Sequence, residues 1–175
     1  GKTRLTYEQI RAIHDLDLQK GTPLWHTRNY FLYSFFNAGI RFGDLCSLTW
    51  ANIVDGRLVY QMHKTGSMKS ILQGKEQENI LKHYRPSKPD ADAYIFPILR
   101  QQHNTLSSLR KEISSRNVMV NKYLKKIAKQ AGIQSNVSFP VARHSFSQYA
   151  LKKGIDLYSI SKALGHSDLK ITEDY

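Results

Sequence analysis

Apolar residues recur at helical spacing in the first quarter of the chain. A capping box at residues 6–9 precedes apolar positions three residues apart, which predicts an amphipathic helix over about 7–18. A second helix is expected to begin at Thr22, with a proline in its first turn, and to end near Gly39. It is apolar around much of its circumference, so we expect its aromatic side chains to lie in the core.

The pattern then changes to short segments. Residues 42–49 predict a short helical turn, and residues 57–63 and 68–72 alternate in a way that suits two strands. The tetrapeptide 64–67 between the strands suits a hairpin turn. Three prolines in 85–97 predict a loop.

The remaining pattern is helical. Further helices are expected at about 74–84, 114–131, 140–153, 157–164 and 168–175. We find no internal repeat and no second domain, so residues 1–175 are interpreted as a single domain. The predicted fold class is mostly α with a small antiparallel β hairpin.

Charge adds a function class to this picture. The 175 residues carry 26 Lys and Arg against 14 Asp and Glu, a net charge of +12. Such a surplus favours a polyanionic partner, most simply nucleic acid.

The single cysteine, Cys46, excludes an internal disulfide framework and a Cys-pair zinc site, and we expect it to be inert on an apolar helix face. No apolar run approaches the roughly 18 residues of a membrane span, so an intracellular protein is expected.

Breaking and rejoining a phosphodiester without a metal requires three kinds of group. The chemistry needs a nucleophile, cationic donors for the transition-state charge and an acid for the departing oxygen. Arginine suits the cationic clamp, lysine suits the acid because its pKa can be moved, and a tyrosine phenol suits the nucleophile. The alternative of a metal-dependent nuclease has little support, because the sequence has no evident carboxylate cluster or His/Cys spacing of the required kind.

Three segments carry such groups. Segment 37–50 holds Arg41, with Asp44 three residues later; segment 141–146 holds Arg143; and Leu-Gly-His at 164–166 is followed nine residues later by Tyr175. These segments resemble the two arginine motifs and the C-terminal signature of the tyrosine recombinase (phage integrase) family. The second motif is similar to that of integrases of Bacteroides-type mobile elements. Lys64 matches the family's hairpin lysine, and Lys69 lies on the other arm of the same hairpin.

The resemblance implies the fold of DNA breaking-rejoining enzymes and a role for each residue. Tyr175 would attack the scissile phosphate and form a 3′-phosphotyrosine. Arg41 and Arg143 would clamp the non-bridging oxygens, and His166 would donate a hydrogen bond to the same phosphate. Lys64 would protonate the leaving 5′-oxygen. No metal and no cofactor is implied, because the phosphotyrosine conserves the bond energy.

The resemblance also implies partners and context. Asp44 would orient a neighbouring arginine. The partner would be double-stranded DNA, with strand exchange through a Holliday junction in a tetrameric synaptic complex in the bacterial cytoplasm, at the nucleoid. We expect a catalytic fragment without its N-terminal DNA-gripping domain and C-terminal tail. Such a fragment would bind DNA weakly and could be monomeric.

One position departs from the family pattern. The family places a histidine three residues before the second arginine, where this chain has Pro140, whose side chain neither donates nor accepts. Either the remaining residues suffice, which we favour because two arginines supply the larger effect, or His144 or a water substitutes. The alternatives are a catalytically inactive DNA-binding regulator on the same fold and a type IB topoisomerase-like activity.

A group of four lysines has two open interpretations. They recur at helical spacing and are Lys122, Lys125, Lys126 and Lys129. They are either a solvated helix face or a set of sequence-independent phosphate contacts. The sequence does not decide between the two.

Overall fold

The computed structural model describes residues 2–154 of the chain. Its helices are α1 (Tyr7–His14), α2 (Pro23–Phe36), α3 (Phe42–Ser47), the 3-10 turn η1 (Trp50–Asn52), α4 (Lys75–Leu81), α5 (Leu106–Gln130) and α6 (Val141–Lys152). Its strands are β1 (Ile53–Val54), β2 (Arg57–Gln61) and β3 (Met68–Leu72). The prediction of a mostly α fold with a small antiparallel sheet is confirmed for this part of the chain.

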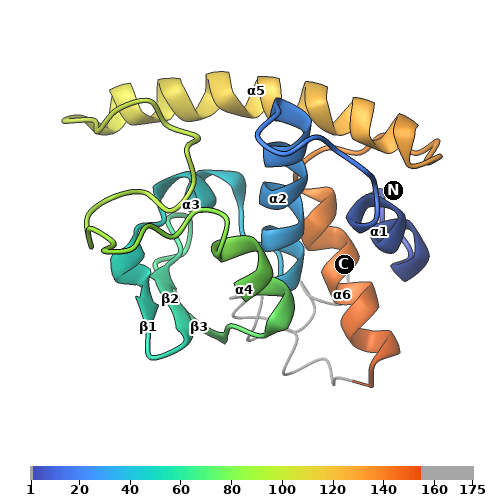
Figure 1. The fold of residues 1–175 in the computed structure, drawn as a ribbon, viewed down its shortest axis with the longest axis horizontal. Helices are drawn as coiled ribbons and strands as arrows, with labels where there is room; N and C mark the ends of the chain where they lie inside the picture. Colours follow the sequence, from blue (N-terminus) through green and yellow to red (C-terminus); the bar gives the residue numbers. More distant parts are fainter. Residues whose placement is uncertain (1, 155–175) are drawn as a thin grey trace.

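Helix α2 is the centre of the packing. It contacts α1, α4, α5 and α6, and Figure 1 shows α5 crossing one end of α2 while α6 runs beside it. The side chain of Thr22 caps α2 by accepting a hydrogen bond from the backbone N–H of Trp25, and Pro23 occupies the first turn. Phe31, Tyr33 and Phe35 are almost completely buried, which confirms that these aromatic residues form the core.

The sheet has three antiparallel strands in the order β1-β2-β3. The short strand β1 was not predicted, because two residues give no periodicity. In the β2–β3 pairing, Tyr60 lies opposite Lys69. Leu58 and Tyr60 of β2 and Lys69 of β3 are buried, so this face of the hairpin turns toward the core.

Two helix boundaries differ from expectation. α1 ends at His14 instead of residue 18, and α5 begins at Leu106 instead of residue 114. The start of α5 is set by Thr105, whose side chain accepts from the backbone N–H of Ser108. Leu106, Leu109 and Ile113 already stand at helical spacing, and Leu109 and Ile113 pack against the core, so the pattern itself extends to the observed start.

The other expected elements within the described part are confirmed. β3 has its expected bounds, α3, β2, α4 and α6 lie slightly inside theirs, and 85–97 contains no helix or strand. The helices expected at 157–164 and 168–175 lie outside the described residues. No helix in residues 2–154 combines the length and the apolar character that a membrane crossing needs.

Candidate active site

The turn that follows α2 is held in an unusual backbone shape. Ala38 and Gly39 have φ angles of 62° and 78°, both in the left-handed region. The hydroxyl of Ser34 donates to the carbonyl of Ile40 (2.7 Å), and the N–H of Gly39 donates to the carbonyl of Ser34 (2.7 Å). These buried hydrogen bonds fix the direction in which the chain enters Arg41.

Arg143 packs directly on this turn. A Cβ atom added to Gly39 would lie 2.4 Å from the Cα of Arg143, so glycine is required for the approach. The Nη1 atom of Arg143 donates to the carbonyl of Gly39 (3.0 Å), and the residue is 5% exposed. The second arginine motif is thereby fixed to the turn two residues before the first motif's arginine.

Pro140 has a structural function in this arrangement. It occupies the N-cap position of α6, and its carbonyl accepts from the N–H groups of Arg143 (3.0 Å) and His144 (3.1 Å). The proline thus starts the helix turn that presents Arg143. Its side chain contributes no hydrogen bond, as predicted.

Arg41 lies at the N-cap position of α3 and carries the clearest sign of a missing ligand. Its Nη1 atom is buried and has no hydrogen-bond partner among the described residues. A buried guanidinium nitrogen without an acceptor costs free energy unless a ligand supplies one. A phosphate oxygen would be such an acceptor.

The two arginines meet around the sheet. The positive charges of both Arg143 and Arg41 help to lower the pKa of Lys69, and both also act on the Tyr60 phenol. Arg143 also donates to the carbonyl of Gly39, two residues before Arg41. The two arginine motifs therefore meet at the turn after α2.

Lys69 is a member of this group that sequence reasoning did not select. It is 3% exposed; its Nζ lies 3.4 Å from the carbonyl oxygen of Asn37 and 5.5 Å from the centroid of the Tyr60 ring. Burial, followed by the charges of Arg143 and Arg41, lowers the pKa of Lys69 to about 7, while Asp44 opposes this effect. The signal was the strand alternation, which places Lys69 on the core-facing side of β3.

Lys64, the predicted proton donor, lies elsewhere on the hairpin. It is exposed in the turn between β2 and β3 and is not brought into contact with either arginine in the described structure. A flexible side chain in this turn can approach a bound phosphate without being fixed in advance. The predicted role of Lys64 stays a prediction.

The interpretation of Asp44 was wrong. Its buried carboxylate does not orient an arginine: Oδ1 accepts from the backbone N–H of His63 (3.0 Å) and lies 3.2 Å from His63 Nδ1. Asp44 therefore attaches the hairpin to α3 at the residue before Lys64. This contact holds the hairpin turn near Arg41.

A buried polar network supports the site from the α4 side. The phenol of Tyr33 donates to Gln73 Oε1 (2.7 Å), and Gln73 Nε2 donates to Asn37 Oδ1 (2.7 Å). Asn37 Nδ2 in turn donates to the carbonyl of Tyr33 (2.8 Å). These hydrogen bonds fix the side chain of Asn37, and the backbone carbonyl of Asn37 faces Lys69.

The remaining predicted residues have separate outcomes. His166 and Tyr175 lie outside the described residues. Burial raises the pKa of the Cys46 thiol, which agrees with an inert cysteine. His144 is half-buried; burial and the nearby Lys2 lower its pKa. Residues 2–154 contain no cluster of His, Cys, Asp and Glu that could hold a metal ion.

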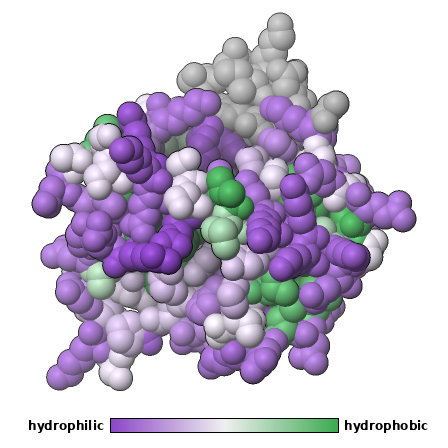
Figure 2. All heavy atoms as spheres, turned by 90° about the horizontal axis from the view of Figure 1, so that it is seen from above, coloured by the Kyte–Doolittle hydropathy of each residue, from purple (hydrophilic) through white to green (hydrophobic). Residues whose placement is uncertain are grey.

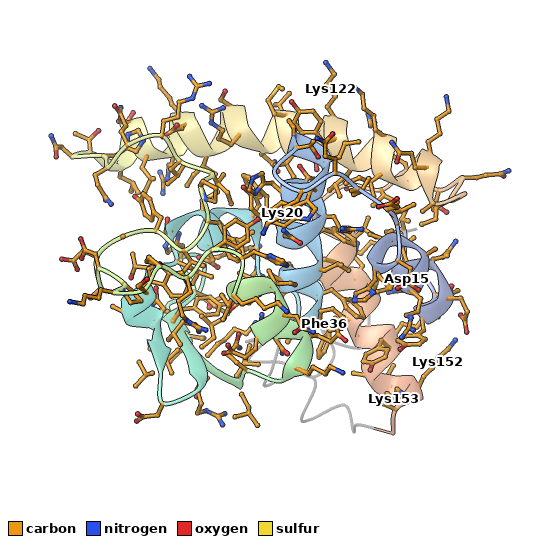
Figure 3. All side chains as sticks on the ribbon, viewed as in Figure 1. Asp15, Lys20, Phe36, Lys122, Lys152 and Lys153 are labelled. Carbon is orange, nitrogen blue, oxygen red and sulfur yellow. The ribbon has the colours of Figure 1, made fainter. Side chains whose placement is uncertain are left out.

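The four lysines of α5 form a separate, exposed surface, which we term the α5 lysine face. It consists of Lys122, Lys125, Lys126 and Lys129, all exposed, opposite the buried Leu124 and Ile127. Figure 2 looks onto the α5 side of the molecule and shows a mainly hydrophilic surface. In Figure 3, Lys122 points outward from this side, whereas Phe36, after which the Asn37–Arg41 turn begins, lies at the other end of α2.

Comparison with known proteins identifies related chains. The family model described as the phage integrase family matches residues 3–175. A tyrosine recombinase XerC of Xanthomonas axonopodis pv. citri (strain 306) is 27% identical over 166 residues, covering 94% of this chain and 51% of the relative. A tyrosine recombinase of Agathobacter rectalis is 32% identical over 146 residues, 80% of this chain and 44% of the relative. The chain spans about half the length of these relatives.

Solved structures show the same fold. The crystal structure of XerA recombinase matches with a TM-score of 0.67 at 21% identity, over 98% of this chain and 57% of that one. A lambda integrase tetramer bound to a Holliday junction matches with a TM-score of 0.68 at 20% identity, over 98% of this chain and 47% of that one. At these identities the match establishes the fold, and the chemistry has to be argued from this chain's own residues.

Proposed function

Because the chain belongs to the phage integrase family, we propose that it breaks and rejoins DNA strands as the catalytic domain of a site-specific recombinase. The observation that carries the proposal is the buried Arg41 Nη1, which has no acceptor among the described residues and lies near Arg143. Two neighbouring guanidiniums match the charge and shape of a phosphodiester. The α5 lysine face is instead exposed to solvent.

The proposed reaction is a transesterification. Arg41 and Arg143 bind the two non-bridging oxygens and stabilise the charge that develops on them. The Tyr175 phenol loses its proton to solvent as its oxygen attacks phosphorus, the bond from phosphorus to the 5′-oxygen breaks, and a 3′-phosphotyrosine forms. Lys64 supplies the proton that the departing 5′-oxygen takes up, and His166 donates a further hydrogen bond to the phosphate. Attack by a free 5′-hydroxyl reverses these steps and rejoins the strand.

The wider assembly follows from the same chemistry. Exchange of strands between two duplexes requires four active sites, and the lambda integrase neighbour is a tetramer bound to a Holliday junction. We propose double-stranded DNA as the partner and a tetrameric synaptic complex for the whole protein, which would move a mobile element in the bacterial cytoplasm at the nucleoid. The isolated chain is proposed to be a monomer that binds DNA weakly.

The test is covalent capture. The chain, alone and within its full-length protein, is incubated with a pool of nicked duplexes whose sequences are randomised, because a nick beside the cleavage point lets the small 5′ product diffuse away. A protein–DNA adduct that survives denaturing electrophoresis is expected from the wild type and is expected to persist in EDTA. Sequencing of the trapped DNA then gives the target site.

Two variants control this experiment. Tyr175→Phe removes the nucleophilic oxygen with little change in shape and is expected to abolish the adduct. Tyr123→Phe makes the same change in α5, far from the site in sequence, and is expected to retain it. Binding without any adduct from the full-length wild type would contradict the proposal and support an inactive regulator.

A further inference from the structure

Among residues 2–154, Lys69 is the one buried cation that the proposed reaction does not use. It lies on β3, opposite Tyr60 of β2, with its Nζ 3.4 Å from the Asn37 carbonyl. That distance makes the hydrogen bond a weak one. An amine is rarely buried among so few polar groups unless something compensates for its charge.

The surroundings of Lys69 are unusually positive. The charged groups that act on it are Arg41, just before α3, Arg143 on α6 and the Asp44 carboxylate on α3. The Tyr60 ring covers it from β2, and the Tyr60 hydroxyl has no hydrogen-bond partner among the described residues. Two positively charged neighbours and one negatively charged neighbour give the surroundings of Lys69 a net positive charge of one, which one further negative charge would balance.

A DNA phosphate would supply that charge. The acceptor missing from Arg41 Nη1 and the missing negative charge beside Lys69 belong to the same turn, Asn37–Arg41. Lys69 Nζ lies 3.4 Å from the Asn37 carbonyl, and Arg143 donates to the Gly39 carbonyl (3.0 Å), two residues before Arg41. Lys69 also lines an open groove between β3, the end of α2 and the middle of α6, together with Ala38 and Phe146, on a side that neither arginine lines. Lys69 is therefore at the wall of an opening and not sealed in the core.

We propose that Lys69 is a proton-accepting member of the Arg41–Arg143 phosphate site: when a DNA phosphate binds beside the two guanidiniums, the Lys69 amine takes up a proton, and its charge then holds the phosphate. The proton comes from solvent, and an N–H bond is the only covalent bond that changes. This inference rests on the proposed DNA-binding function and adds to it a residue and a proton that binding requires.

The burial of Lys69 supplies the proton-free amine. With a pKa of about 7, Lys69 is mostly neutral at about pH 8. A nearby anion favours the charged form and raises the pKa again. Binding thus takes up close to one proton at about pH 8 and little at about pH 6, where the amine is already charged.

Two measurements on the full chain test this. The first is NMR of 13C-labelled lysine side chains, with Lys69 assigned by its loss in Lys69→Met. We expect a transition near pH 7 in the free chain and, with a short duplex of arbitrary sequence, a transition higher by about three pH units, back near the ordinary pKa of lysine. A Lys69 transition that duplex binding leaves unmoved would overturn the inference.

The second measurement is duplex affinity by fluorescence anisotropy at low salt, between about pH 7.5 and about pH 9, above the usual pKa of histidine. Uptake of one proton weakens wild-type binding by close to tenfold per pH unit. Lys69→Met, which cannot be charged, and Lys69→Arg, which stays charged, are both expected to lose this dependence. Lys75→Met, an exposed lysine near β3, is the matched control that is expected to keep it.

The outcomes separate the two proposals. If no duplex binds to the wild type at any pH, the proposed function fails. If the duplex binds but both Lys69 variants keep the wild-type pH dependence, the function stands and Lys69 is only a structural residue. The NMR measurement uses a variant only to assign the Lys69 signal, and Lys69→Arg removes the same lysine signal as Lys69→Met, so one variant that fails to fold does not rescue the inference.

Discussion

The positive charges of this domain occur in two contrasting arrangements. The α5 lysine face presents four exposed ammonium groups to solvent. Arg41, Arg143 and Lys69 are instead held by the turn after α2, by Gly39 and by the strand pairing. The exposed face contributes more charges, but the second group has the organisation that a single phosphate requires.

The difference shows that net charge predicts a class of partner but not a site. Exposed lysines are screened by salt, and their hydration makes them inexpensive to retain. A buried cation costs folding free energy in the absence of its ligand. Such a cation is therefore expected where a bound ligand offsets that cost. The four predictions that follow test this contrast, beginning with the largest expected effect.

Neutralising either arginine is expected to have the largest effect. Arg41→Gln or Arg143→Gln removes a donor that acts on the developing charge, so adduct formation on the substrate pool should slow by at least about 10²–10³-fold. Lys125→Gln on the α5 lysine face removes a charge of the same sign and should change the rate very little. Adduct rates are read from denaturing gels. A loss for Lys125→Gln as large as the loss for either arginine variant would show that the two groups of charges do not differ in function.

The second prediction concerns the turn that positions Arg143. Gly39→Ala places a Cβ 2.4 Å from the Arg143 Cα, so the two elements must separate. We expect a loss of about 1–3 kcal/mol in the free energy of unfolding, from overpacking, together with most of the loss in adduct rate seen for Arg143→Gln. Chemical denaturation and adduct assays measure the two effects.

Gly21 offers a matched control for that variant. Its φ is 85°, close to the 78° of Gly39, but a Cβ there would meet nothing within 4 Å. Gly21→Ala therefore carries the same backbone strain without the collision, and it should leave adduct formation intact. A comparable loss of adduct in both variants would show that strain, and not the contact with Arg143, controls the site.

The third prediction is the effect of Lys69 on stability. Its pKa is about 7 in the folded chain against an ordinary 10.5, so the unfolded chain binds more protons between these values. Wild-type stability should therefore rise as pH increases from about 7 to about 10. Lys69→Met should be more stable than the wild type near pH 7, by on the order of 2–4 kcal/mol, and the difference should shrink as pH rises.

Denaturant midpoints across this pH range provide the measurement. Lys126→Met, which removes an exposed lysine of the α5 lysine face, is expected to follow the wild-type curve at every pH. If Lys69→Met were less stable than the wild type at about pH 7, the amine would be a net stabilising group and the picture of a costly buried cation would be incorrect.

The sequence predicted the helices and strands better than the contacts between them. The core helix α2 and the hairpin followed from periodicity and caps, which are local properties. The start of α5 was missed although Leu106, Leu109 and Ile113 keep the helical spacing and Thr105 caps the helix. The role of Asp44 was wrong because its partner, His63, is 19 residues away. A motif shows which residue types lie together in the chain, whereas hydrogen-bond partners depend on how the elements pack.

At the candidate site, too, the sequence showed the local motifs but not the contacts between residues distant in the chain. Arg41 and Arg143 were found because each lies in a recognisable local motif. Lys69 was passed over in favour of Lys64, since only the pairing with β2 and the packing against α2 bury its amine. The close approach of Gly39 to Arg143 joins residues 104 positions apart and has no local signature.

The smallest effect is expected from the α5 lysine face itself. If all four lysines touched phosphates, changing them together to glutamine would reduce the slope of log affinity against log salt by roughly 3.6, at about 0.9 per contact. Lys122 points away from the side where the turn after α2 lies, so we expect a change in slope below about 1 and an unchanged adduct rate. Anisotropy titrations of the full chain at several salt concentrations measure the slope. A loss near the full value would show that DNA also contacts the α5 side, and the exposed charges would then be a binding surface in their own right.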